Sequence, residues 1–147
     1  MALAAFLFTA CSASPDAAPT RSTASPTPTP TASAPAAPTL QPDGTAADNL
    51  PLFTAVTDRV WASKSKARGR AYIDALVAAG FDKSAMQVTK DKTTVGSPVE
   101  SLQFSVLWGD ECLIGQVGPS TGRPVTAVMP ALEGDTCLIG ETRPIDW

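Results

Sequence analysis

The runs SLQFSVLW (residues 101–108) and CLIG (residues 112–115) are separated by only three residues, Gly109, Asp110 and Glu111. In the first run apolar side chains alternate with smaller or polar ones, which predicts a half-buried strand. Gly109-Asp110 favours a tight turn, so we expect the second run to return as an antiparallel strand. The predicted buried face of the first strand consists of Leu102, Phe104, Val106 and Trp108.

Further elements are predicted on both sides of this hairpin. Residues 86–88 and 125–129 alternate with period two and are predicted strands, and residues 90–98 are a predicted loop. Apolar residues at helical spacing predict helices over 49–63, with Pro51 in the first turn and Trp61 in the core, and over 68–79, followed by Gly80 as a C-terminal cap. The sequence therefore predicts an α+β fold for residues 48–147, with two N-terminal helices packed on a small antiparallel sheet of three to four strands.

A seven-residue motif occurs twice, as GDECLIG at 109–115 and as GDTCLIG at 134–140. The copies suggest two similar strand entries joined by a disulfide between Cys112 and Cys137, which is the default for an even cysteine pair in an exported protein. Closing a loop of about 26 residues should stabilise the domain by roughly 3.5 kcal/mol. A redox or metal-binding pair is disfavoured, because neither cysteine lies in a CxxC unit and the chain has no histidine.

The N-terminus resembles the signal peptide of a bacterial lipoprotein. Residues 1–10 are apolar apart from Thr9 and lead directly into Cys11. In such a lipobox the cysteine is lipidated and becomes the first residue of the mature protein, although Phe8 stands where leucine is usual and no basic residue precedes the run. The run is also too short to span a membrane, which takes about 20 residues. The alternative is an apolar N-terminus with an incidental cysteine.

Residues 12–47 consist almost entirely of Pro, Ala, Ser and Thr. This composition buries too little apolar surface to fold, so we expect residues 11–47 to be a lipidated cysteine followed by a disordered tether with polyproline II bias. The Thr-Pro and Ser-Pro pattern is also typical of O-glycosylated stalks. A proline-rich ligand for another protein is the alternative.

Composition disfavours several functions. A net charge of −3 and a pI near 4.8 give no basic footprint for nucleic acid. The absence of histidine removes the commonest general base and the commonest metal ligand. Asp110, Glu111, Glu133 and Asp135 cluster in sequence, but they flank glycines at predicted turns, where acidic side chains bond to the backbone. We therefore expect no catalytic residue, no metal and no cofactor.

One basic run, consisting of Lys64, Lys66, Arg68 and Arg70, lies between the two predicted helices. It is a candidate site for an anionic surface, either lipid headgroups or an anionic wall polymer. The alternative is a solvated loop, because Ser, Ala and Gly interrupt the charges.

Five blocks of sequence agree in order with a known pattern. They are GRAYID (69–74), GFDK (80–83), QFSV (103–106), CLIGQ (112–116) and TRPIDW (142–147). Together they resemble a family of uncharacterised actinobacterial lipoproteins with a domain of unknown function, over essentially all of 48–147. The resemblance implies a lipid-anchored exported protein with paired Cys112 and Cys137, and it implies no activity.

The anchor, the spacer and the small stapled domain predict a non-enzymatic protein on the extracytoplasmic face of the cell membrane that contacts an envelope protein or a wall component. The alternative is a small-ligand-binding lipoprotein associated with a membrane system, which requires an apolar pocket with convergent polar groups. An enzyme, the third hypothesis, requires a carboxylate with a strongly perturbed pKa inside a cleft.

Replacement of the predicted lipidated residue tests the anchor. The Cys11→Ser variant should move from the membrane to the soluble fraction, because no lipid would hold it at the bilayer. Fractionation and immunoblotting beside the wild type measure this shift, and unchanged membrane retention would contradict the lipoprotein interpretation.

Overall fold

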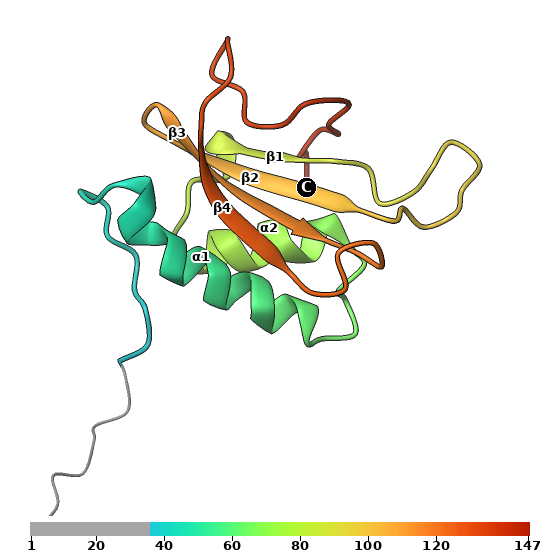
Figure 1. Cartoon of the computed structure of the whole chain (residues 1–147), viewed down its shortest axis with the longest axis horizontal. Helices are drawn as coiled ribbons and strands as arrows, with labels where there is room; N and C mark the ends of the chain where they lie inside the picture. The colour runs from blue at the N-terminus through green and yellow to red at the C-terminus, as the bar shows by residue number, and fades with distance from the viewer. Residues whose placement is uncertain (1–35) are drawn as a thin grey trace, which may run out of the picture. The chain divides into compact units, whose positions relative to one another are not determined.

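The structure is a computed structural model that describes residues 36–147 (Figure 1). The predicted signal peptide, Cys11 and the predicted tether as far as residue 35 lie outside the described residues. Residues 36–47 also belong to the predicted tether, and the structure describes them.

Two helices precede a four-stranded sheet. The helices are α1 (Ala46–Trp61) and α2 (Gly69–Ala78), and a short 3-10 helix, η1 (Lys83–Ala85), leads into the sheet. The strands are adjacent in chain order and antiparallel throughout: β1 (Met86–Val88), β2 (Leu102–Trp108), β3 (Glu111–Val117) and β4 (Val125–Pro130). Both helices lie against one face of the sheet (Figure 1). The predicted α+β fold is confirmed.

Helix α1 begins three residues before its predicted start at residue 49. The Thr45 hydroxyl accepts a hydrogen bond from the Asp48 amide at 3.2 Å, and the Asp48 carboxylate accepts one from the Thr45 amide at 2.9 Å. This capping box fixes the first turn at Ala46. Pro51 is therefore the sixth helical residue and lies in the second turn, not in the first as predicted.

Contacts ahead of α1 extend the domain N-terminally of residue 48. The buried side chain of Asn49 accepts a hydrogen bond from the Gln41 amide at 2.8 Å and donates one to the Gln41 carbonyl at 2.9 Å. Leu40 packs against the hydrophobic core. Because both backbone groups of Gln41 are satisfied by one buried side chain, residues 40–41 are fixed to the helix.

The core between the helices and the sheet is built around Phe104 of β2. Its ring stacks on Tyr72 of α2, with centroids 4.5 Å apart, and its centroid lies 5.7 Å from that of Phe53 of α1. Gly115 pairs with Phe104 on β3, and a Cβ atom at this position would overlap the Phe104 ring, so only glycine fits. The other predicted core residues are buried in this core or packed against it: Leu102, Val106, Trp108 and Trp61.

The second face of the sheet is crossed by the segment that follows β4 (Figure 1). The predicted disulfide is present and joins Cys112 of β3 to Cys137 of this segment, with Cα atoms 5.7 Å apart. The side-chain oxygen of Gln87 on β1 accepts hydrogen bonds from the amides of Cys137 at 2.7 Å and Leu138 at 3.1 Å. The disulfide and the Gln87 side chain therefore hold the segment across the sheet from β3 to β1.

The two copies of the repeated motif adopt different structures. CLIG of the first copy belongs to β3, whereas residues 137–140 of the second copy form no strand, so the expected second strand entry is wrong. In the first turn Gly109 has a positive φ of 65°, whereas in the second turn both Gly134 (76°) and Asp135 (56°) do. The first copy is paired on both sides, with β2 and β4, and this pairing decides its structure.

Strand β4 forms one outer edge of the sheet. The Ala131 amide donates to the Asp110 carbonyl at 2.9 Å and so points inward, toward the β2–β3 hairpin. Backbone groups alternate along a strand, so those of Thr126, Val128 and Pro130 point outward. Because proline has no N–H, Pro130 removes one of the three outward donors from this edge.

The disulfide determines both thiol reactivity and stability. In a Cys11→Ser background, neither Cys112 nor Cys137 should react with a thiol reagent in denaturant until reductant is added. Reduction should lower the free energy of unfolding by about 3.5 kcal/mol, because the unfolded chain gains entropy when the loop opens. Denaturant titration of the oxidised and reduced forms measures the difference. Stoichiometric labelling without reductant, or identical midpoints for the two forms, would contradict this prediction.

Candidate functional site

The structure divides the predicted basic run. Lys64, Lys66 and Arg68 are exposed in the connection between α1 and α2, whereas Arg70 lies on α2. The Arg70 Nε atom lies 3.2 Å from the Asp74 carboxylate one helical turn away, so its charge is paired. Lys64, Lys66 and Arg68, by contrast, form no ion pair within residues 36–147.

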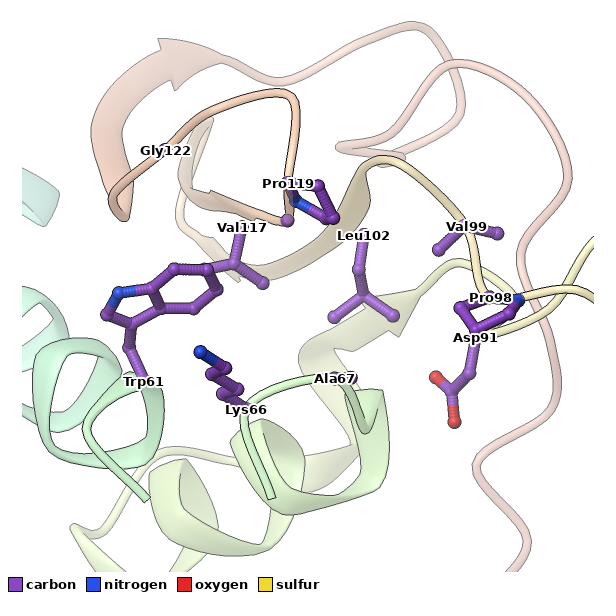
Figure 2. A pocket seen from close by; sticks show the side chains of 11 residues that line it. Trp61, Lys66, Ala67, Asp91, Pro98, Val99, Leu102, Val117, Pro119 and Gly122 are labelled. Atoms are coloured by element: carbon purple, nitrogen blue, oxygen red, sulfur yellow. The ribbon is translucent and has the colours of Figure 1, made fainter. Parts of the chain in front are cut away.

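Lys66 lies beside a cavity of about 400 Å³ (Figure 2). Trp61 lies on one side of the cavity, and Asp91 and Pro98 lie on the other (Figure 2). Most of the lining side chains are apolar. The lining residues are Trp61, Lys66, Ala67, Asp91, Pro98, Val99, Leu102, Val117, Gly118, Pro119 and Gly122.

Pairing at one end of the sheet builds the cavity. Trp61 is the last residue of α1, while Leu102 is the first residue of β2 and pairs with Val117, the last residue of β3. Gly118 follows with a φ of 146°, and a Cβ atom there would overlap the Glu100 carbonyl. Because Gly118 has no side chain, the β3–β4 connection can approach the end of the β1–β2 connection and close one wall.

The Lys66 backbone is held by the core. The buried Tyr72 side chain donates from its hydroxyl to the Lys66 carbonyl at 2.8 Å. The Lys66 ammonium nitrogen lies 5.1 Å from the centroid of the Trp61 ring, a cation–π distance. Within residues 36–147, Lys66 forms no ion pair. Its charge is therefore positioned at the cavity but is not neutralised by a neighbouring carboxylate.

Asp91 has a structural role at the other end of the cavity. Arg68 provides no side-chain cap for α2, and Asp91 accepts a hydrogen bond from the Gly69 amide at 2.8 Å instead. Arg143 lies 3.3 Å from the same carboxylate and pairs with it. Asp91 thus stabilises the start of α2, where the helix dipole favours a negative charge.

The other predicted acidic residues are not gathered into a cleft. None of Asp110, Glu111, Glu133 and Asp135 lines the cavity beside Lys66 or the second cavity by the β1–β2 connection. Between residues 36 and 147, no group of three or more acidic or cysteine residues is arranged to hold a metal ion, and no helix is both long and apolar enough to cross a membrane.

A second cavity, of about 450 Å³, lies by the β1–β2 connection, and most of its lining residues are polar. Lys90 and Glu141 at its rim form an ion pair of 2.7 Å. The hydrogen bond from Lys90, together with its positive charge, holds the pKa of Glu141 below its usual range. The second cavity is more open to solvent than the first and therefore encloses less of a ligand. Its lining residues are Thr89, Lys90, Lys92, Thr93, Thr94, Val99, Ser101, Gln103 and Glu141.

Comparison with known proteins gives one match. The family model described as Domain of unknown function (DUF6993) matches residues 57–141, which include every residue that lines the first cavity and both cysteines of the disulfide. No curated protein and no solved structure matches the chain.

The single tyrosine of the chain, Tyr72, gives a direct test of the packing beside the cavity. Burial raises the pKa of Tyr72 to about 12. In the unfolded chain this pKa should be near 10, so the free energy of unfolding should fall as the pH rises from about 10 to about 12. Ultraviolet absorbance of the phenolate follows the titration with and without denaturant, and a Tyr72→Phe variant should lack this part of the alkaline destabilisation. A pKa near 10 in the folded protein would contradict burial of the Tyr72 hydroxyl.

Proposed function

We propose the function of this chain from the site itself, because the chain belongs to the family described as Domain of unknown function (DUF6993), whose description names no activity. The protein is a non-enzymatic, lipid-anchored protein of the cell envelope. It binds a small, partly apolar ligand in the cavity beside Trp61. Of the two non-enzymatic functions that the sequence left open, this is the one that a specific structural observation favours.

The cavity is the observation that carries the proposal. Its volume of about 400 Å³ lies in the range of small-molecule sites, about 300–1,000 Å³. Such sites combine apolar walls with a few polar groups that orient the ligand. Here Trp61, Pro98 and Pro119 supply accessible apolar surface, and Lys66 supplies a charge that forms no ion pair within residues 36–147.

The proposed location rests on the N-terminal sequence. Cys11 follows an apolar run as in a lipoprotein signal peptide, and the resemblance to actinobacterial lipoproteins supports attachment at the extracytoplasmic face of the membrane. The chain enters the domain at the Thr45 end of α1, while Trp61 and the cavity lie at the other end. Sixteen helical residues span about 24 Å, so the point of attachment leaves the cavity clear.

Contact with a wall component or a protein partner has less support. That hypothesis rests on the anchor, the spacer and the small stapled domain, with Lys64, Lys66, Arg68 and Arg70 as a candidate site for an anionic surface. Arg70 is paired with Asp74, and Lys66 lies at the cavity. Lys64 and Arg68 are exposed in the α1–α2 connection.

A neutral apolar dye tests whether the cavity binds ligands. In the full chain carrying Cys11→Ser, which excludes competition by lipid, N-phenylnaphthylamine should bind with a saturable rise in fluorescence at one molecule per chain. Ala67 is exposed and lines the cavity, so Ala67→Phe should fill the cavity and weaken binding at least about tenfold without damage to the core.

The matched control is Ala62→Phe. Ala62 lies in the same connection and is exposed, but it does not line the cavity, so this variant should bind the dye like the parent. Equal affinity for the parent and for both variants would place the dye elsewhere and would refute ligand binding in this cavity. Circular dichroism of the three proteins excludes a difference in folding.

A further inference from the structure

Basic residues gather in the three connections around the cavity. The α1–α2, β1–β2 and β3–β4 connections, at residues 62–68, 89–101 and 118–124, hold six Lys or Arg and only two acidic residues, Asp91 and Glu100. Lys90 is paired with Glu141, and the other five basic residues still exceed Asp91 and Glu100 in a chain whose net charge is −3. The six basic residues are Lys64, Lys66, Arg68, Lys90, Lys92 and Arg123.

Acidic residues gather at the opposite end of the domain. The Trp108 indole donates to the Gly44 carbonyl at 2.8 Å, which places the β2–β3 turn beside the start of α1. Figure 1 shows this turn at the other end of the sheet from the β1–β2 and β3–β4 connections. The electric field of the domain is therefore polarised, with its positive end at the cavity. The acidic residues at or close to the far end are Asp43, Asp48, Asp110, Glu111, Glu133 and Asp135.

The carboxylate that lines the cavity does not cancel this field. Asp91 is engaged by the Gly69 amide and by Arg143, on the side of the cavity away from Trp61 (Figure 2). Lys66, by contrast, has the Trp61 ring beneath its ammonium group and no carboxylate partner within residues 36–147. The ammonium group of Lys66 carries three N–H donors, and its contact with the Trp61 ring leaves N–H groups able to donate hydrogen bonds to a ligand.

We propose that the ligand is an amphipathic anion, whose apolar part occupies the space between Trp61, Pro98 and Pro119 (Figure 2) and whose carboxylate or phosphate group contacts Lys66. This inference rests on the proposed function and adds the chemical class of the ligand. A charge-assisted hydrogen bond to Lys66 is stronger than a neutral one. The surrounding basic connections raise the local concentration of anions and repel cations.

Four amphiphiles with the same eight-carbon chain test the proposal: octanol, octanoate, octyl phosphate and octylammonium. Calorimetric titration of the Cys11→Ser full chain should show both anions binding about tenfold more tightly than octanol, because one charge-assisted hydrogen bond is added. Octylammonium should bind more weakly than octanol. Octanoate and octyl phosphate compared with each other identify which anionic group is preferred.

Lys66→Gln and Lys64→Gln form a matched pair of variants. Both remove one charge from the same exposed connection, but only Lys66 lines the cavity. Lys66→Gln should abolish the preference for the anions over octanol, and Lys64→Gln should retain most of it. Octanol binding as tightly as the anions, or equal effects of the two variants, would overturn this inference alone. Failure of all four amphiphiles to bind would overturn the proposed function and this inference with it.

Discussion

The contact between Phe104 and Gly115 is the constraint on which the domain depends. Phe104 lies beneath both helices, because its ring meets Tyr72 of α2 and Phe53 of α1. That position is available only because the paired residue on β3 lacks a side chain. A single strand pair thus sets how closely the helical layer approaches the sheet. Aromatic pairs of this kind stabilise the fold by more than the burial of their apolar area alone.

One residue, Tyr72, connects the hydrophobic core to the cavity. Tyr72 packs its ring on Phe104 and places its hydroxyl on the Lys66 carbonyl. The cation at the cavity is therefore positioned by a side chain whose own position is fixed by the core. Asp91 performs a comparable task on the other side, where it joins the β1–β2 connection to the first amide of α2. Rigid support of this kind reduces the entropy that a ligand must overcome when it binds.

The local sequence pattern was sufficient to predict the helices and strands, but it did not predict the cavity beside Trp61. Alternation in residues 101–108 and the Gly109 turn predicted the hairpin, and cysteine parity predicted the disulfide, because each depends on nearby residues or on a simple count. The start of α1 was misplaced because Thr45 lies in a Pro/Ala/Thr-rich segment whose composition suggested a tether throughout. The second CLIG was misread because strand formation depends on neighbouring strands, which the motif does not encode. The cavity was missed for a related reason, since it arises from the register of Leu102 with Val117 and from the approach of Gly118 to Glu100.

Pro130 on the outer edge of β4 also affects how copies of the protein meet one another. Lipid attachment at Cys11, as proposed, would confine the molecules to a plane and raise their collision frequency. An exposed strand edge in such a crowd invites edge-to-edge aggregation, which natural sheets avoid by interrupting the row of free amides. Pro130 leaves Thr126 and Val128 as the only outward donors of β4, so an incoming strand would find few partners. Pairing of two molecules edge to edge through β4 is therefore disfavoured, even where the molecules are crowded in one plane.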